Sequence, residues 1–140
     1  MAHSAALQKE EKRNGKILLV EDDPRLLDVT YEILDYENYQ VTTAKSGEVA
    51  INTLCENDFD LVITDLNLGQ ASGIAVLKKA KELNPETRVI IMTGNVDVAF
   101  AIEALRLNAD DYLLKPFNLY DLLARVSLCL KKSSPQGTNF

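Results

Sequence analysis

The chain has 140 residues with 15 basic and 21 acidic side chains, so its formal net charge is −6 at pH 7. This acidity argues against direct binding to nucleic acid, since affinity for a duplex comes largely from basic side chains that neutralise phosphates. No apolar run approaches the ~18 residues that cross a membrane, and residues 1–16 are too polar for a signal peptide. The single histidine, His3, lies in this segment, which argues against histidine-based triads and histidine-ligated zinc. We expect one cytoplasmic domain with no membrane partner.

The first apolar segment, Lys16–Val20, is rich in Ile, Leu and Val and is predicted to be a strand buried on both faces. A helix is predicted after it, because Asp23 is a good N-cap residue and Pro24 suits the first helical position. Asn38 falls where this helix has to end in a left-handed conformation, which Asn tolerates. Three apolar residues at helical spacing are expected to form the buried face of the helix: Leu26, Val29 and Ile33.

Two further strand–helix pairs follow. The strand Gln40–Ala44 precedes a weaker helix over 46–57, and the strand Asp60–Thr64 is again a nearly continuous apolar run. The next helix ends at Asn84, because Pro85 disfavours a helical conformation in the residue before it. The expected buried face of that helix is Val76, Ala80 and Leu83.

The last two pairs have the same form. Their strands are predicted at Arg88–Met92 and Asp111–Leu114. The helix between these strands ends at Asn108, and Asn118 can cap the final helix. The expected buried faces are Val98, Ile102 and Leu105 in the first helix and Leu119, Leu123, Val126 and Leu130 in the second.

Strict alternation of strands and helices predicts an α/β fold, in which right-handed crossovers join parallel strands and helices cover both faces. Five strands fit the flavodoxin-like (βα)5 architecture with strand order 2-1-3-4-5. We expect one domain over 15–131, with flexible tails over 1–14 and 132–140.

Polar side chains stand where the predicted strands end. Glu21 and Asp22 follow the first strand and Asp65 follows the third. Thr93 follows the fourth strand and Lys115 follows the fifth. The carboxyl ends of parallel strands meet at one edge of the sheet, where such folds bind their ligands. These side chains, distant in sequence, are therefore expected to converge.

The expected cluster holds more negative charge than it can keep without a cation. Three carboxylates against one ammonium leave a formal charge of −2, so either carboxylates take up protons or a cation binds. A few hard oxygen ligands beside a phosphate suit Mg²⁺ better than Ca²⁺ or Zn²⁺. With this charge neutralised, a carboxylate such as Asp65 can attack a phosphoryl group and form an aspartyl phosphate. Considered singly, Asp22 could be a helix-capping residue and Thr93 an ordinary strand residue.

Four segments carry these residues: Leu18–Pro24, Val62–Leu68, Met92–Gly94 and Asp111–Phe117. In this order and at these strand ends they resemble the receiver domain of bacterial two-component response regulators. The resemblance covers residues 15–131.

The resemblance implies a role for each residue of the cluster. Asp65 would accept a phosphoryl group from a cognate sensor histidine kinase, and Lys115 would pair with a phosphoryl oxygen. Mg²⁺ would be bound beside Asp65 by Asp22 directly, by Glu21 mainly through water, and by the main-chain carbonyl of Asn67. The protein would be a signalling switch that slowly dephosphorylates itself, rather than a turnover enzyme.

Thr93 and Tyr112 would transmit the change in the family's way. The Thr93 hydroxyl would move onto the phosphoryl group and Tyr112 would rotate inward, although an aromatic strand residue can also serve packing alone. The surface of the fourth helix, fifth strand and fifth helix would then change, where an output domain, an effector protein or a second protomer docks. Residues 93–112 resemble receivers of transcriptional activators, so transcription is the expected output. The Lys115–Pro116 bond is expected to be cis.

The chain departs from the family's usual sequence pattern in the loop after Asp65. Gly69 replaces a proline that is usual in the family, and this replacement is expected to loosen the loop that holds Asn67. The family's later glycine is kept as Gly73.

Two alternative functions remain open. A Mg²⁺-dependent phosphatase would also use an aspartyl nucleophile, but such enzymes usually carry a second acid where this chain has Asn67. A receiver that only docks partners would lack a key residue, and none is missing here. The sequence leaves open whether the chain is complete or part of a longer regulator.

Overall fold

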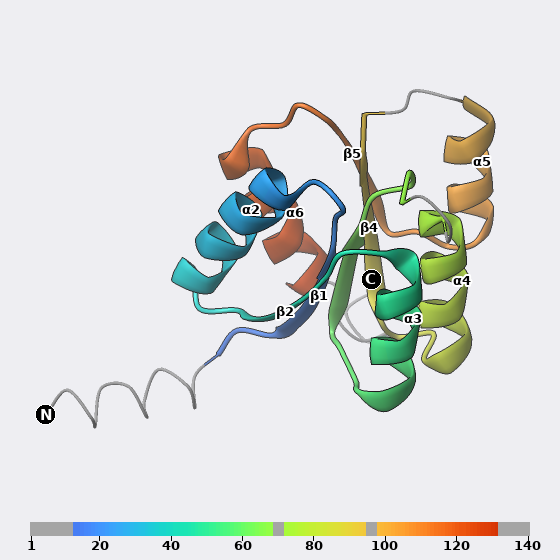
Figure 1. The fold of residues 1–140 in the computed structure, drawn as a ribbon, viewed down its shortest axis with the longest axis horizontal. Helices are drawn as coiled ribbons and strands as arrows, with labels where there is room; N and C mark the ends of the chain where they lie inside the picture. Colours follow the sequence, from blue (N-terminus) through green and yellow to red (C-terminus); the bar gives the residue numbers. More distant parts are fainter. Residues whose placement is uncertain (1–12, 69–71, 95–97, 132–140) are drawn as a thin grey trace, which may run out of the picture.

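The computed structural model describes residues 13–68, 72–94 and 98–131, and in these ranges strands alternate with helices (Figure 1). The strands are β1 (Lys16–Val20), β2 (Gln40–Ala44), β3 (Leu61–Thr64), β4 (Arg88–Thr93) and β5 (Asp111–Leu114). The helices are α2 (Pro24–Tyr36), α3 (Gly47–Glu56), α4 (Gly73–Leu83), α5 (Val98–Arg106) and α6 (Leu119–Lys131). The predicted elements are confirmed, with β3 beginning one residue later and β4 ending one residue later than expected.

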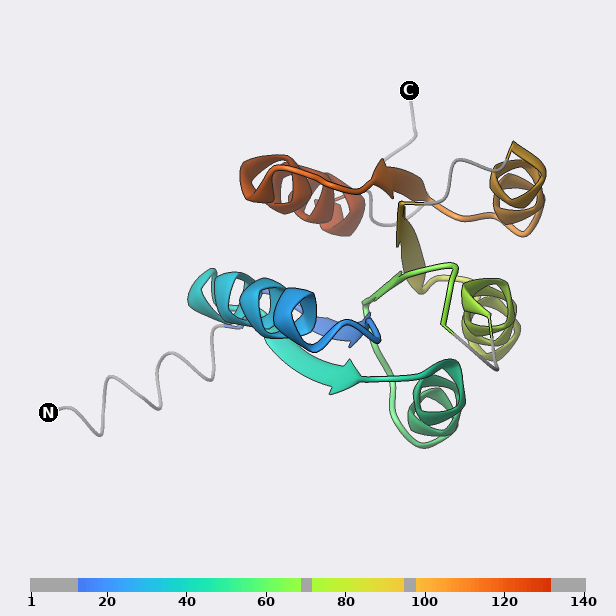
Figure 2. The ribbon, with the colours of Figure 1, turned by 45° about the horizontal axis from the view of Figure 1, so that its top comes forward.

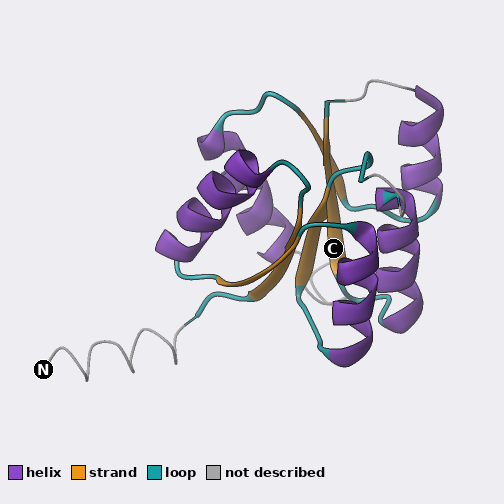
Figure 3. Cartoon of the chain, in the orientation of Figure 1, coloured by secondary structure: helices purple, strands orange, loops and turns teal. Residues whose placement is uncertain are grey.

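The strands form one parallel sheet in the order β2-β1-β3-β4-β5, as predicted. Helices α2 and α6 cover one face of the sheet and α3, α4 and α5 cover the other (Figures 2 and 3). In β1, Leu18 and Val20 belong to the core beneath α3 and α4, whereas Ile17 and Leu19 belong to the core beneath α2 and α6. The first strand is therefore buried on both sides, which is why its sequence is continuously apolar.

The buried face of α2 lies one position away from the predicted one, although Ile33 still packs at the edge of the core beneath α2 and α6. Leu27, Thr30 and Leu34 are the buried residues of this helix, whereas Val29 is 50% exposed. Leu26 and Val29 instead line a pocket of about 640 Å³ beside Lys115, together with Asp23, Arg25, Pro116, Phe117 and Leu119. Leu26 and Leu27 are adjacent near the start of the helix, and Ile33 and Leu34 are adjacent near its end. Helical spacing therefore fits either of two neighbouring faces of the helix.

The buried face of α5 is also corrected. Ala104 is fully buried, whereas Ile102 and Leu105 are 50% and 65% exposed. The side chain of Val98 lies outside the described residues. In α4, Val76 and Ala80 are buried as expected, but Leu77 is buried in place of Leu83. In α6 the buried residues are Leu122, Val126 and Cys129, while Leu119, Leu123 and Leu130 pack at the edge of the same core.

The predicted helix ends are confirmed where the structure describes them. The Asp23 side chain accepts a hydrogen bond from the Arg25 amide at the start of α2. Asn118 Oδ1 accepts one from the Tyr120 amide at the start of α6. Asn38 and Asn108 have positive φ angles of 72° and 71° at the ends of α2 and α5. The Lys115–Pro116 bond is cis, as expected.

Some expectations fall on residues that the structure does not describe. Gly69, residues 1–12 of the predicted N-terminal tail and the whole predicted C-terminal tail, 132–140, lie outside the described residues. At the N-terminal edge of what is described, Arg13 pairs with Asp35 at 3.0 Å. Within the described ranges, no helix combines the length and the apolar character that crossing a membrane requires.

Candidate phosphoacceptor and metal site

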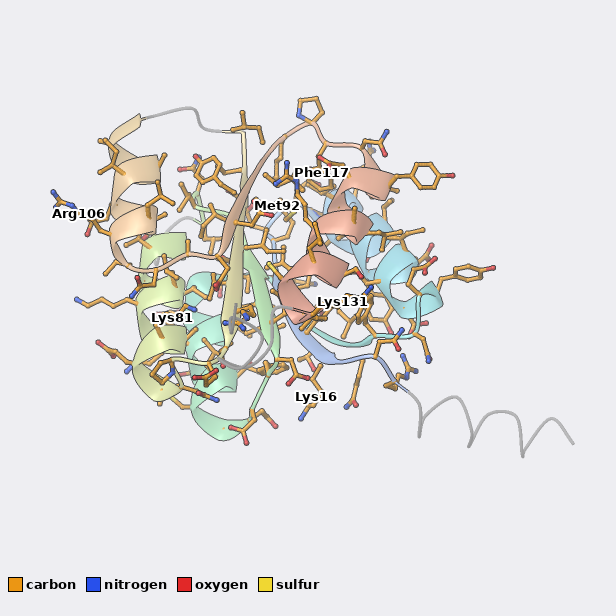
Figure 4. The ribbon with its side chains drawn as sticks, turned by 180° about the vertical axis from the view of Figure 1, so that it is seen from behind. Lys16, Lys81, Met92, Arg106, Phe117 and Lys131 are labelled. Carbon is orange, nitrogen blue, oxygen red and sulfur yellow. The ribbon has the colours of Figure 1, made fainter. Side chains whose placement is uncertain are left out.

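The register of the sheet places the carboxyl ends of four strands side by side. Val20 pairs with Thr64 across β1 and β3, and Thr93 pairs with Leu114 across β4 and β5. The residues after these ends therefore lie at one edge, as predicted from the topology. Figure 4 shows Phe117 of the β5–α6 connection at this end of the sheet, with Lys16 toward the opposite end.

Lys115 joins the two buried carboxylates of the site. Its Nζ donates to Asp65 Oδ2 at 2.7 Å and to Glu21 Oε1 at 2.8 Å. The Glu21 side chain is 1% exposed and that of Asp65 is 7% exposed, whereas the Lys115 side chain is 21% exposed. Two short charge-assisted bonds in a place shielded from water are stronger than a surface ion pair.

Main-chain amides hold the second oxygen of each carboxylate. The Asn67 amide donates to Asp65 Oδ1 at 3.0 Å. The Asp23 amide donates to Glu21 Oε2 at the same distance. Each carboxylate is therefore fixed at one oxygen by Lys115 and at the other by the loop that follows its strand.

Burial and pairing act in opposite directions on the charges of the site. Burial raises the pKa of Glu21, and outweighs the Lys115 and Asp23 hydrogen bonds that lower it. For Lys115, burial acts to lower the pKa, but hydrogen bonds and charge attraction from Asp65 and Glu21 outweigh burial and raise the pKa. Lys115 is therefore a firmly protonated cation at neutral pH.

Three carboxylates of the site could share one cation. Oxygen atoms of Glu21, Asp22 and Asp65 lie within 4.8 Å of one another. Asp22 is exposed, so this side of the cluster is open to solvent. Carboxylate oxygens are the donors that Mg²⁺ prefers, and an open side leaves room for the waters that Mg²⁺ retains. The residues present therefore fit a magnesium ion.

Thr93 adjoins this cluster at the end of β4, and Tyr112 lies on β5, where it pairs with Ile91 of β4. Thr93 is fully buried, and its carbonyl accepts a hydrogen bond from the Lys115 amide at 2.9 Å. Tyr112 is half-buried and packs against the core beneath α3 and α4. The structure thus brings every predicted site residue to one end of the sheet, and their roles in switching stay predictions.

Two contacts with the main chain of Asp65 were not predicted from the sequence. The hydroxyl of Thr64 donates to the Asp65 carbonyl oxygen at 3.0 Å. Gly73, the first residue of α4, lies so close that a Cβ atom there would be 1.9 Å from the same oxygen. The signal in the sequence was Gly73 itself, which the resemblance marks as the later glycine that the family keeps, without indicating what it contacts.

Comparison with known proteins decides the family. The family model of the response regulator receiver domain matches residues 17–127. The chain belongs to this family. The resemblance seen in the four strand-end segments is therefore confirmed, and the family consists of signalling domains rather than turnover enzymes.

Relatives of this receiver domain include named transcriptional regulators. The transcriptional regulatory protein ZraR of Escherichia coli K12 is 39% identical over 117 residues, which are 84% of this chain and 26% of ZraR. The transcriptional regulatory protein CpxR of Klebsiella pneumoniae is 38% identical over 119 residues, which are 85% of this chain and 50% of CpxR. The receiver thus spans half or less of the length of these two relatives.

Solved receiver structures have the same fold. A CheY-like receiver domain protein of Methanospirillum hungatei has a TM-score of 0.82 and 32% identity, covering 84% of this chain and 94% of that one. The BeF₃-activated receiver domain of DrrB has a TM-score of 0.77 and 37% identity, covering 84% of this chain and 97% of that one. The flavodoxin-like architecture is therefore shown by sequence, topology and structural similarity together.

Proposed function

We propose that this receiver is a phosphorylation-controlled signalling switch, in which Asp65 accepts a phosphoryl group from a histidine kinase in a Mg²⁺-dependent reaction. The observation that carries the proposal is the placement of Asp65. Its carboxylate lies between the Lys115 ammonium at 2.7 Å and two further acids that can share a cation with it.

The side chains supply most of the parts that phosphoryl transfer needs. An oxygen of Asp65 attacks phosphorus, a P–O bond forms, and the P–N bond of the donor phosphohistidine breaks with its electron pair on the imidazole. Lys115 donates hydrogen bonds to the oxygens of the transferring group. Mg²⁺, held by Glu21, Asp22, Asp65 and the main-chain carbonyl of Asn67, would neutralise charge on those oxygens.

Asp65 starts this reaction in a fixed orientation. The Asn67 amide and Lys115 hold separate oxygens of its carboxylate, so the nucleophile does not have to be ordered during the reaction. Asn67 itself carries a neutral amide, which cannot act as the general acid of a phosphatase. The site thus favours one slow turnover of its own phosphate over repeated hydrolysis of a substrate.

Phosphorylation would act by shifting a conformational equilibrium. Thr93 is buried one strand away from Asp65, and Tyr112 packs on the next strand, toward α5. Movement of the Thr93 hydroxyl onto the phosphoryl group would leave space that the Tyr112 side chain can enter. This would stabilise one of two conformations of the surface that α5, β5 and α6 form. The fragment of each relative that matches this chain belongs to a transcriptional regulator, so we propose an output domain or effector that controls transcription.

Intact-mass spectrometry after incubation with acetyl phosphate tests the proposal. We expect the mass of one phosphoryl group to be added in the presence of Mg²⁺, little addition in EDTA, and none to Asp65→Asn. Absence of the adduct in folded wild-type protein with Mg²⁺ would contradict the proposal and favour a receiver that only docks partners. Addition to Asp65→Asn would place the chemistry elsewhere.

A further inference from the structure

We propose that Thr64 and Gly73 are positioning residues that fix the main-chain carbonyl of Asp65 and thereby aim its carboxylate for phosphoryl transfer. The inference rests on the proposed role of Asp65 as phosphoacceptor. Neither residue would touch the phosphoryl group. Both contact the same atom, the Asp65 carbonyl oxygen, from different elements of the fold.

Thr64, the last residue of β3, contacts this atom through its hydroxyl. The side chain is fully buried, and its Oγ1 donates to the Asp65 carbonyl oxygen at 3.0 Å. A buried hydroxyl without a partner is costly, so this bond is maintained in the folded state.

Gly73 contacts the atom by close packing. A Cβ atom built there would lie 1.9 Å from the Asp65 carbonyl oxygen and 2.8 Å from both Asp65 C and Leu66 Cα. The Gly73 amide also donates to the Leu66 carbonyl at 3.0 Å. All of the atoms in the way belong to the main chain, so any side chain at position 73 must displace the peptide that carries Asp65. The start of α4 therefore packs directly against the main chain of the loop that follows β3 and carries Asp65.

These contacts determine where the carboxylate points. The Asp65 amide donates to the Val20 carbonyl at 3.3 Å, so the residue is held through its N–H and its carbonyl together. With both groups fixed, the direction of its Cα–Cβ bond is fixed. A misplacement of about 1 Å can lower a reaction rate about 100-fold, so loss of either contact should slow phosphorylation even when the fold persists.

Thr64 offers a pair of variants that separates positioning from stability. Thr64→Val keeps the volume of the side chain but removes the hydroxyl, whereas Thr64→Ser keeps the hydroxyl and removes a buried methyl group. If Thr64 serves stability alone, both folded variants are phosphorylated at the wild-type rate, whatever their stabilities. If Thr64 positions Asp65, folded Thr64→Val reacts slowly, whereas folded Thr64→Ser reacts like wild type.

The experiment measures the rate of phosphorylation by acetyl phosphate at saturating Mg²⁺, by intact mass, beside a thermal unfolding curve for each variant. We expect Thr64→Val to react about tenfold more slowly and Thr64→Ser to stay within about twofold of wild type. In ¹H–¹⁵N spectra of the unphosphorylated protein, the Asn67 amide should shift in Thr64→Val and much less in Thr64→Ser, since this amide donates to Asp65 Oδ1.

Gly73→Ala gives a second test, with Gly15→Ala as its matched control. A Cβ at position 15 would lie 3.3 Å from Leu130 Cδ1, the end of a flexible side chain remote from Asp65. We expect Gly73→Ala to react at least about tenfold more slowly and Gly15→Ala to react like wild type. If Gly73→Ala does not fold, the Thr64 pair still decides the proposal.

Wild-type rates for folded Thr64→Val, together with an unmoved Asn67 resonance, would overturn this inference and leave the proposed function intact. Failure of the wild-type protein to take up phosphate would instead overturn the proposed function. Equally slow reaction of folded Thr64→Ser and folded Thr64→Val would also reject positioning by the hydroxyl.

Discussion

Lys115 holds two buried carboxylates at once, and this explains how so acidic a site is stable in the folded chain. Asp65 and Glu21 each accept a hydrogen bond from its ammonium group, and each also receives a main-chain amide. The pKa of Glu21 is still raised, because burial outweighs these contacts. Lys115 is therefore both a predicted participant in phosphoryl transfer and the main counter-charge of the resting site.

Replacement of Lys115 by Met should show how much the two buried carboxylates destabilise the fold when their cation is removed. We expect Lys115→Met to lower the free energy of unfolding by about 1–3 kcal/mol at neutral pH, because a buried carboxylate loses its partner. A carboxyl group with a raised pKa contributes stability at low pH and loses it as the pH rises. The deficit should therefore shrink as the pH is lowered from neutral and Glu21, whose pKa is raised by burial, takes up a proton. Urea unfolding of wild type and Lys115→Met in EDTA measures this loss of stability.

The effect of added Mg²⁺ on this variant, and on a variant of a second lysine, provides the controls. Added Mg²⁺ should restore part of the stability of Lys115→Met, because a cation bound by Glu21, Asp22 and Asp65 replaces the missing charge. In Lys81→Met, Mg²⁺ should give no more stabilisation than in wild type. Lys81 pairs with Asp110 at 2.9 Å, before the start of β5 and away from the acidic cluster. A deficit independent of both pH and Mg²⁺ would contradict the assignment of Lys115.

The site residues could be predicted because parallel strands bring their carboxyl ends together, so a polar residue after each apolar run was sufficient. The contacts of Thr64 and Gly73 could not be predicted in this way. They depend on the direction of one hydroxyl and on how closely α4 approaches the loop after β3, and neither leaves a repeated pattern in the sequence. Local backbone geometry, rather than topology, determines them.

At the scale of elements, strands were predicted more accurately than helix faces. A strand buried on both sides is apolar at every position, so its assignment does not depend on phase. In α2 the correct stripe contains Thr30, a polar residue that is fully buried, while the exposed stripe contains the apolar Val29. One buried polar residue therefore made the wrong face look the more apolar one.

Thr30 gives a prediction about the packing of α2. Its Oγ1 is buried with no hydrogen-bond partner among the described residues. Thr30→Val keeps the shape and removes this unsatisfied hydroxyl, so we expect the free energy of unfolding to rise by about 1 kcal/mol. The matched control is Thr53→Val, since the Thr53 hydroxyl donates to the Val49 carbonyl at 2.7 Å on the outside of α3. Urea unfolding should show no gain for Thr53→Val, and a loss for Thr30→Val would show that its hydroxyl is satisfied after all.

At the scale of the whole molecule, two apolar residues of α5 that were predicted to be buried face the solvent. Ile102 and Leu105 are 50% and 65% exposed, beside the edge strand β5. One charged residue of each sign, Glu103 and Arg106, is exposed beside them on α5, and Figure 4 shows Arg106 pointing away from the sheet. An apolar centre with both charge signs at its rim can pair with a copy of itself about a two-fold axis. A second protomer is therefore the occupant that we predict for this face after phosphorylation.

Sedimentation velocity with and without acetyl phosphate and Mg²⁺ tests this prediction. We expect wild-type protein to change from monomer to dimer on phosphorylation, and Leu105→Glu to remain monomeric while still gaining one phosphoryl group by mass. A buried glutamate at the centre of the interface would carry an unpaired charge, which is costly enough to prevent association. Leu83→Glu is the matched control, because Leu83 is also 50% exposed but lies at the end of α4. It should dimerise like wild type. A phosphorylated wild-type protein that stays monomeric would show that this face receives an output domain or effector instead of a second copy.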